Sequence, residues 1–241
     1  MKKFVTLLLA VAMAALLCAC GEEKKDEGVM SYADFVAAEV DAPVVVDTYV
    51  QAKQGWWEDN GQGKASIYSQ EPYGAYFIYD MKCTEEEYNK LNLGTKIRVT
   101  GFKSEWSGEV EIVDATFTLL DEGDTFVAVP KNVTDLLGTD KLIDSQNQYV
   151  YFEGLEIAPC NDGAAFNYKW DNSGSDGDDL YFNVTDGTNT YTFTVESYLT
   201  GAGTDVYEAV KALNVGDKVD LEGFLYWYEG ANPHITSVTV K

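Results

Sequence analysis

The sequence predicts an all-β protein with minor α content, built from two similar five-stranded domains in tandem. A twelve-residue stretch, 91–102, recurs at 213–224 with six identical positions. The same order of predicted strands and helices surrounds both copies. The 241 residues suffice for two small domains, and the hydrophobic fraction of 46% suffices for two cores. An internal repeat of this kind predicts a repeated fold.

The first copy begins with a short helix that Ser31 and Asp34 would cap, although Asp replaces the usual Glu or Gln. Val44 to Lys53 then alternates between apolar and polar residues, which is typical of a half-buried strand. Thr84 opens a second helix with acidic residues in its first turn. The predicted elements are a helix at 31–39, strands at 44–53, 64–69 and 75–80, a helix at 84–91, and strands at 96–103 and 109–120.

The second copy repeats this order after a junction at Asp121 to Asp124. Asn132 and Asp135 have the cap spacing of Ser31 and Asp34, so we expect a short helix there too. The other predicted elements are strands at 149–158, 180–185 and 190–195, a helix at 204–213, and strands at 218–225 and 234–240. Gly101 and Gly223 should lie at matching bends where the backbone approaches closely.

Three strands, a helix and two strands, with a shared Gly-x-Lys-[Ile/Val]-x-[Val/Leu]-x-Gly-Phe strand, resemble the OB-fold. The resemblance implies a closed Greek-key barrel in each copy, 30–120 and 121–241. It also implies that the loops after strands one and four flank a ligand face. An immunoglobulin-like sandwich is the rival, but it needs about seven strands and has no helix at this place.

The first twenty residues have the order of a bacterial export signal. Lys2 and Lys3 precede an apolar run from Phe4 to Leu17, too short to span a bilayer comfortably. The run ends in Leu-Cys-Ala-Cys, which resembles the lipobox that signal peptidase II cleaves before the lipidated Cys. The resemblance implies a signal peptide at 1–19, lipidation of Cys20, an acidic tether at 20–29, and a lipid-anchored place in the bacterial cell envelope, outside the cytoplasm. An ordinary secretory signal is the alternative.

The chain is strongly acidic, with 40 Asp and Glu against 17 Lys and Arg and a formal net charge of −23. Nucleic-acid affinity comes largely from neutralising phosphates with Lys and Arg. The charge therefore predicts that nucleic acid is not the partner. We expect a glycan, a peptide or another envelope protein instead, and a monomeric chain anchored to the membrane.

All five Trp residues fall in or beside loops, and an indole left in water calls for an explanation. The loops after the first strands carry three of them, and the loops after the fourth strands carry the other two. We predict that these rings and one strand-three Tyr bind a ligand, with folding back over the barrel ends as the alternative. The residues are Trp56, Trp57, Trp106, Tyr79, Trp170 and Trp227.

Catalytic and metal sites are not indicated. His234 is the only His and lies on a predicted strand, so we expect it to be structural and not catalytic. No Ser-His-acid triad is proposed around it, and zinc-ligand spacing is missing. Asp176 and Asp178 are the nearest approach to a metal loop, but a solvated acidic loop explains them better. Cys83 and Cys160 are either buried thiols or a cross-domain disulfide.

The sequence thus predicts a membrane-anchored, non-catalytic ligand-binding or adaptor module without a cofactor. The first alternative is an OB-fold lipoprotein that binds single-stranded DNA or RNA. The second alternative is a hydrolase with an unrecognised site.

Overall fold

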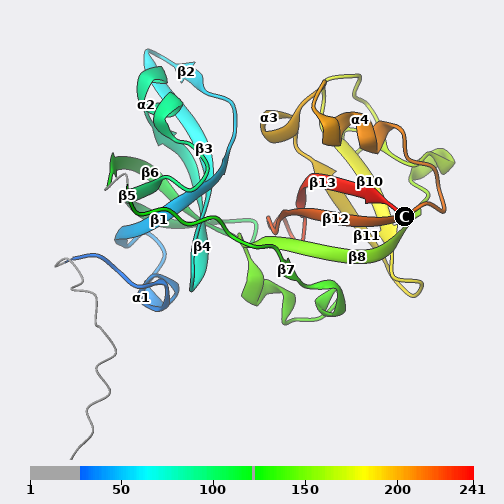
Figure 1. Ribbon diagram of the computed structural model, residues 1–241, viewed down its shortest axis with the longest axis horizontal. Helices are drawn as coiled ribbons and strands as arrows, with labels where there is room; N and C mark the ends of the chain where they lie inside the picture. The colour runs from blue at the N-terminus through cyan, green and yellow to red at the C-terminus, as the bar shows by residue number, and fades with distance from the viewer. Residues whose placement is uncertain (1–27, 121–122) are drawn as a thin grey trace, which may run out of the picture.

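The computed structural model describes residues 28–120 and 123–241, which form two lobes joined by a short linker (Figure 1). The predicted signal peptide 1–19, the lipidation site Cys20 and most of the 20–29 tether lie outside the described residues. In the part that is described, no helix has the length and apolar character needed to cross a membrane.

The first lobe is a closed OB-fold barrel of five strands. Its sheet runs in the order β1 (Pro43–Lys53), β5 (Lys96–Trp106), β6 (Glu109–Leu119), β4 (Gly74–Lys82), β3 (Gln62–Glu71), and a further β1–β3 pairing closes it. A short extra strand, β2 (Trp57–Asp59), pairs with β3 inside the segment predicted to be a loop.

Strand β1 has the alternating burial that its sequence predicts. Val44, Val46, Thr48 and Val50 are all buried, whereas their neighbours along β1 are only partly buried or exposed. Helix α1 (Tyr32–Ala37) starts at a capping box made by Ser31 and Asp34, as predicted.

Helix α2 (Glu85–Lys90) lies between β4 and β5, where the OB-fold places its helix. Thr84 caps it, and Glu87 completes a capping box. Gly94 then reverses the chain with a φ of 81°, a left-handed conformation that glycine adopts without strain.

The second lobe is the same barrel again. Its order is β8 (Tyr149–Ala158), β12 (Lys218–Phe224), β13 (His234–Val240), β11 (Thr190–Val195), β10 (Leu180–Thr185), closed by a β8–β10 pairing. Helix α4 (Asp205–Lys211) occupies the place of α2 and is capped by Thr204. The remaining elements are β7 (Lys131–Asn132), β9 (Asn167–Tyr168) and α3 (Ser197–Thr200).

One predicted helix is wrong in type. Residues Thr134–Leu136 form a single 3-10 turn, followed by further turns at Leu142–Ser145 and Asn161–Gly163. The Asn132 side chain accepts a hydrogen bond from the backbone N–H of Thr134, 3.0 Å away. This contact closes a local turn and does not extend into a helix. The cap spacing alone therefore did not secure an α-helix.

Gly101 and Gly223 occupy matching bends, as predicted. A Cβ at Gly101 would lie 2.7 Å from the carbonyl oxygen of Val113, and one at Gly223 would lie 2.2 Å from that of His234. The strand register shifts at both places. Only glycine allows these close approaches.

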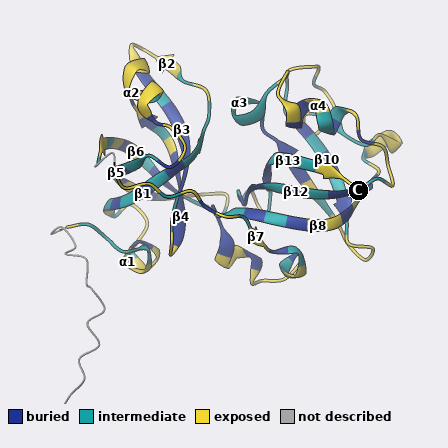
Figure 2. Cartoon of the chain, in the orientation of Figure 1, coloured by how far each residue is buried: buried dark blue, intermediate teal, exposed yellow. Residues whose placement is uncertain are grey.

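Each barrel keeps its own buried interior (Figure 2). Tyr68 and Phe77 of the first barrel and Phe224 of the second form a separate buried cluster at the junction. The backbone N–H of Gly55 donates to the carbonyl of Tyr198 at 2.9 Å, which adds a polar tie across the junction.

Candidate ligand-binding cleft

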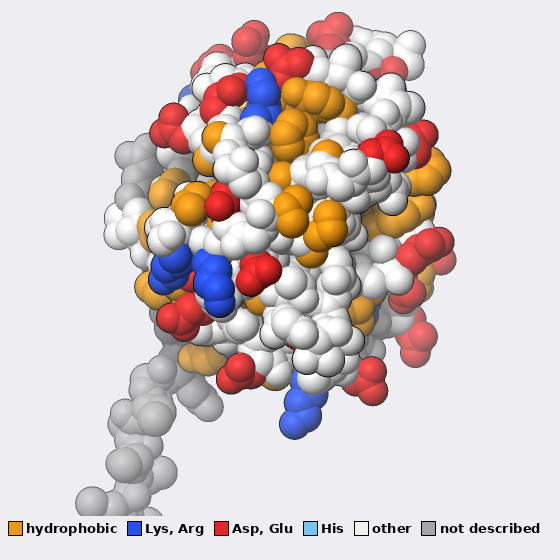
Figure 3. Space-filling model, turned by 90° about the vertical axis from the view of Figure 1, so that its right-hand side faces the viewer, with side chains coloured by type: hydrophobic (Ala, Val, Ile, Leu, Met, Phe, Trp, Pro, Cys, Tyr) orange, Lys and Arg blue, Asp and Glu red, His pale blue; other side chains and the backbone are white. Residues whose placement is uncertain are grey.

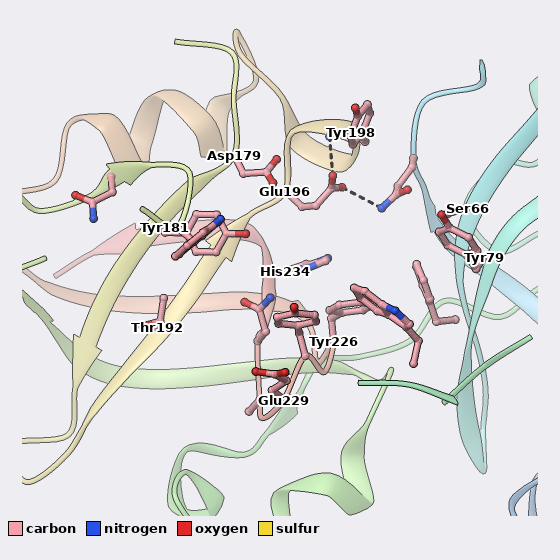
Figure 4. Close-up of a pocket in the computed structure, with 18 of the residues that line it drawn as sticks. Ser66, Tyr79, Asp179, Tyr181, Thr192, Glu196, Tyr198, Tyr226, Glu229 and His234 are labelled. Atoms are coloured by element: carbon pink, nitrogen blue, oxygen red, sulfur yellow. Dashed lines mark hydrogen bonds between the residues drawn. The ribbon is translucent and has the colours of Figure 1, made fainter. Parts of the chain in front are cut away.

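A cleft of about 1310 Å³ lies between the two barrels. The first barrel contributes the loop after β1 and strands β3 and β4, and the second contributes β10, β11 and the segment around Tyr226 (Figure 4). Ligand sites in proteins are commonly hollows of several hundred cubic ångströms between packed units. The cleft is large enough to hold several rings of a ligand.

Exposed aromatic side chains gather in this cleft. The described residues include eight strongly exposed aromatic side chains, and six of the eight line it. Both barrels contribute, so the gathering depends on how the barrels dock. The six are Trp57, Tyr79, Trp106, Trp170, Tyr198 and Tyr228.

Four of the six residues predicted to bind ligand therefore line one cleft. Trp57 and Tyr79 lie on one side with Trp106, and Trp170 comes from the opposite barrel. The prediction had placed the rings of the first barrel around one end of that barrel alone. The structure instead places them opposite the second barrel, across a shared cleft.

The other two predicted residues are not among those that line the cleft. Trp56 packs against the first core, and its indole N–H donates to the carbonyl of Cys83 at 3.1 Å. Trp227 packs against the second core and lies close to Gly108 of the first barrel. For these two rings, folding back onto the barrels is the better interpretation.

Carboxylates and amides supply the polar groups of the cleft. Glu196 is 8% exposed and accepts hydrogen bonds from the Gln54 amide at 3.0 Å and the Tyr198 N–H at 3.1 Å. Burial raises its pKa from 4.5 to about 7. Asp179 accepts from the backbone N–H and the hydroxyl of Ser197 at 2.8 and 2.6 Å. Figure 4 shows both acids beside each other at one wall.

His234 lies deep in the cleft, 6% exposed, with its ring stacked on Tyr226 at a centroid distance of 4.4 Å. Its Nδ1 is 2.6 Å from the hydroxyl oxygen of Tyr68. Burial lowers the pKa of His234 to about 3, so its imidazole is neutral near pH 7. The expectation that His234 is structural fits this buried bridge between the barrels.

The polar lining contains no Lys or Arg among the described residues, although Asp80, Asp179, Glu196 and Glu229 line it. Two lysines lie beside rings of the cleft. Lys64 Nζ is 4.9 Å from the centre of the Trp57 ring, and Lys169 precedes Trp170 in the chain. Acidic side chains are also spread over the outer face of the second barrel (Figure 3).

The described residues contain no group of three or more side chains that could together bind a metal ion. Asp176 pairs with Lys211 at 2.8 Å, and Asp178 pairs with Lys169 at 3.4 Å. Cys83 is a buried free thiol and Cys160 a partly buried one, so the structure favours the thiol alternative over the cross-domain disulfide.

Sequence reasoning missed most of the residues that line the cleft. Tyr226 and Tyr228 flank the predicted Trp227 and could have been found from the same loop argument. Asp179 ends an acidic loop before β10, and Glu196 and Tyr198 follow β11; no sequence pattern marks them as cleft residues. Their role depends on the docking of the barrels, which no local pattern encodes.

Comparison with solved structures returns proteins of the same general architecture at low similarity. The Ifi202 HINa domain in complex with 20-bp double-stranded DNA is 13% identical, covers 84% of this chain and 96% of its own, and has a TM-score of 0.35. A murine DNA-binding protein bound with double-stranded DNA is 12% identical, covers 83% and 94%, and has a TM-score of 0.36. A replication protein A heterotrimer bound to single-stranded DNA is 11% identical, covers 83% and 49%, and has a TM-score of 0.34.

No family model and no curated protein matches the chain.

These comparisons contradict the expectation that nucleic acid is not a partner, because all three named structures are DNA complexes. The expectation rested on the charge of the whole chain. At physiological salt, exposed charges more than about 8 Å apart are largely screened. A net charge of −23 therefore does not decide what one cleft binds.

Proposed function

We propose that this protein is a non-catalytic OB-fold binding module that holds single-stranded nucleic acid in the cleft between its barrels. The observation that carries the proposal is the gathering of six of the eight exposed aromatic side chains in that one cleft. Leaving these rings in water on a monomer is unfavourable unless a ligand covers them.

The placement of the rings supports stacking as the mode of binding. Trp57 follows the first strand of its barrel, and Trp106 lies at the end of β5, the fourth barrel strand. These are the two loops through which OB-folds bind oligonucleotides and oligosaccharides. Every base has a π-face, and stacking on an aromatic side chain contributes about 1–3 kcal/mol per base.

The distribution of charge supports an arrangement with bases inside the cleft and phosphates outside it. Carboxylates line the interior and would repel a phosphate, whereas Lys64 and Lys169 lie beside Trp57 and Trp170. Both lysines are ion-paired at 3.4–3.7 Å with partly exposed acids, and such pairs are weak enough to exchange for a phosphate.

The test is a binding titration of the purified protein with a fluorescent twelve-nucleotide single strand, its duplex, and a neutral hexasaccharide. We expect the single strand to bind and added salt to weaken it modestly, because few phosphates are neutralised. Binding of the duplex alone, or of neither nucleic acid, would contradict single-stranded nucleic acid as the ligand.

An oligosaccharide is the second candidate, and the lining without Lys or Arg favours it. Carboxylates accept hydrogen bonds from hydroxyl groups, and amides both donate and accept. The hexasaccharide arm of the titration decides between the two candidates. Binding of the sugar with no binding of the single strand would replace the first proposal with the second.

We further propose that Cys20 anchors the protein to the membrane of a bacterial envelope. The order of basic residues, apolar run and lipobox-like Leu-Cys-Ala-Cys supports this. A single acyl chain binds membranes only marginally, so a two-chain modification is expected. Cys20→Ala should release the protein or leave it unprocessed. A Cys20→Ala protein that is still mature and lipidated in the membrane fraction would refute the anchor.

A further inference from the structure

Two carboxylates of the second barrel form an acidic corner of the cleft, made of Asp179 and Glu196. The β10–β11 ladder ends at the pair Leu180 and Val195. Asp179 and Glu196 are the next residues on the two strands, so they lie opposite each other (Figure 4). Asp179 also accepts two hydrogen bonds from Ser197, the residue after Glu196. In the described part of the chain, neither carboxylate is ion-paired with a Lys or Arg.

Glu196 is the buried member of the acidic corner, with 8% of its surface exposed. Its two oxygens accept hydrogen bonds from neutral donors only, the Gln54 amide at 3.0 Å and the Tyr198 N–H at 3.1 Å. Burial is the main reason that its pKa rises to about 7, and the charge of Asp179 raises it further. Buried charges in proteins are normally paired with an opposite charge. The described residues supply none here, so a positively charged ligand group fits this position.

The acidic corner and its neighbour His234 hold two acceptor atoms without a hydrogen bond from any described residue. One is Oδ2 of Asp179, since Ser197 donates to Oδ1 only. The other is Nε2 of His234, a side chain that is 6% exposed and lines the cleft. His234 pairs in register with Thr194, two residues before Glu196 and on the same face. With its ring proton on Nδ1, the imidazole accepts a hydrogen bond at Nε2.

Aromatic rings line the cleft beside the acidic corner. Tyr181 follows Asp179 by two residues, so both side chains lie on the same face of the sheet. Burial raises the pKa of Tyr181, and the charges of Asp179 and Glu196 raise it further. Trp170 follows Lys169, whose backbone N–H donates to the carbonyl of Asp179 at 2.9 Å. The face of an aromatic ring attracts a cation within about 6 Å. Rings and carboxylates therefore favour the same kind of ligand.

We propose that the acidic corner binds the ammonium group of a small-molecule amine. An ammonium carries three N–H donors, which match the carboxylates of Asp179 and Glu196 and Nε2 of His234. A quaternary ammonium has the charge without the donors, and a hydroxyl has a donor without the charge. The inference goes beyond the proposed function, because the corner belongs to the second barrel and takes a different class of ligand. The strand is proposed to stack on Trp57 and Trp106 of the first barrel.

The experiment is a calorimetric titration of the purified protein with linear diaminobutane, linear butanediol and tetramethylammonium. At pH 8, Glu196 is ionised, because its pKa is about 7, and an alkyl ammonium keeps its proton as a lysine side chain does. We expect the diamine to bind about tenfold or more tightly than either control, since hydrogen bonds to charged groups contribute about 1.5–3 kcal/mol. Equal affinity for the diamine and either control would overturn the proposal.

Glu196→Gln and Asp179→Asn each remove one charge of the acidic corner and keep an oxygen that accepts the existing hydrogen bonds. Each should weaken the diamine about tenfold and leave butanediol unchanged. Glu156→Gln is the matched control, because Glu156 is exposed on β8 and does not line the cleft. It should bind the diamine as the unmodified protein does.

Thermal unfolding of each variant shows that it is folded before it is titrated, and two separate substitutions keep the test available if one fails to fold. Unchanged diamine affinity in a folded Glu196→Gln or Asp179→Asn protein would overturn the site. No nucleic acid is present in these titrations, so a failure of the diamine to bind leaves the single-strand proposal standing. A failure of the strand to bind likewise leaves the amine site standing.

Discussion

The buried carboxyl group of Glu109 allows a quantitative test of how the barrels are joined. Glu109 is 0% exposed, and its Oε2 atom accepts the backbone N–H of Trp227 from the other barrel at 2.9 Å. Its Oε1 atom has no partner among the described residues. Burial raises the pKa of Glu109 from 4.5 to about 8. The folded protein therefore holds this proton more tightly than the unfolded chain does.

Because the pKa of Glu109 is higher in the folded state, the free energy of unfolding depends on pH. Below the ordinary pKa of 4.5 both states are protonated, and the carboxyl does not change stability with pH. As the pH rises to about 8, the unfolded chain ionises first and the folded state loses stability. Each tenfold change in proton affinity corresponds to about 1.4 kcal/mol, so the total loss is on the order of 5 kcal/mol.

Glu109→Gln removes the titration and keeps an oxygen that can accept the Trp227 N–H. The free energy of unfolding, measured with urea at several pH values, should favour the variant increasingly from about pH 5 to about pH 8 and then level off. Glu105→Gln, the same change at an exposed site, is the control and should run parallel to the unmodified protein. Parallel curves for Glu109→Gln as well would refute the claim that this buried carboxyl is neutral at pH 7.

Two further predictions concern stability alone. Trp56→Ala should destabilise the protein by about 3–5 kcal/mol because the ring packs on the core, whereas Trp57→Ala should change stability by less than about 1 kcal/mol; equal losses by thermal unfolding would contradict the assignment of the two rings. Gly223→Ala should destabilise by about 1–3 kcal/mol or more, because its Cβ would lie 2.2 Å from the carbonyl oxygen of His234; an unchanged melting temperature would show that the bend tolerates a side chain.

The sequence predicted the barrels well because each strand carries its own signal. The alternation from Val44 to Lys53 and the capping residues Ser31 and Thr84 depend on nearby residues only. The repeat then transferred the pattern from one copy to the other. The 3-10 turn after Asn132 was predicted as an α-helix because a single capping residue cannot distinguish a turn from a helix.

The site was harder to predict because it belongs to neither barrel alone. Trp56 and Trp57 are neighbours at the entry to β2, yet one packs inward and the other lines the cleft. Successive side chains of an extended chain point to opposite sides, so only one of the pair could face a ligand. His234 gains its contact with Tyr68 only when the barrels dock, which the local sequence does not encode.

The most direct test of the aromatic cleft is a comparison of two double variants in the same binding titration. Trp57→Ala/Trp106→Ala removes two exposed rings from the cleft, whereas Tyr73→Ala/Phe102→Ala removes two exposed rings elsewhere. With a twelve-nucleotide single strand containing all four bases, the first variant should lose about 2–6 kcal/mol of binding at one stacked base per ring. The second variant should bind as the unmodified protein does. Equal affinity of both double variants and the unmodified protein would contradict the cleft as the binding site.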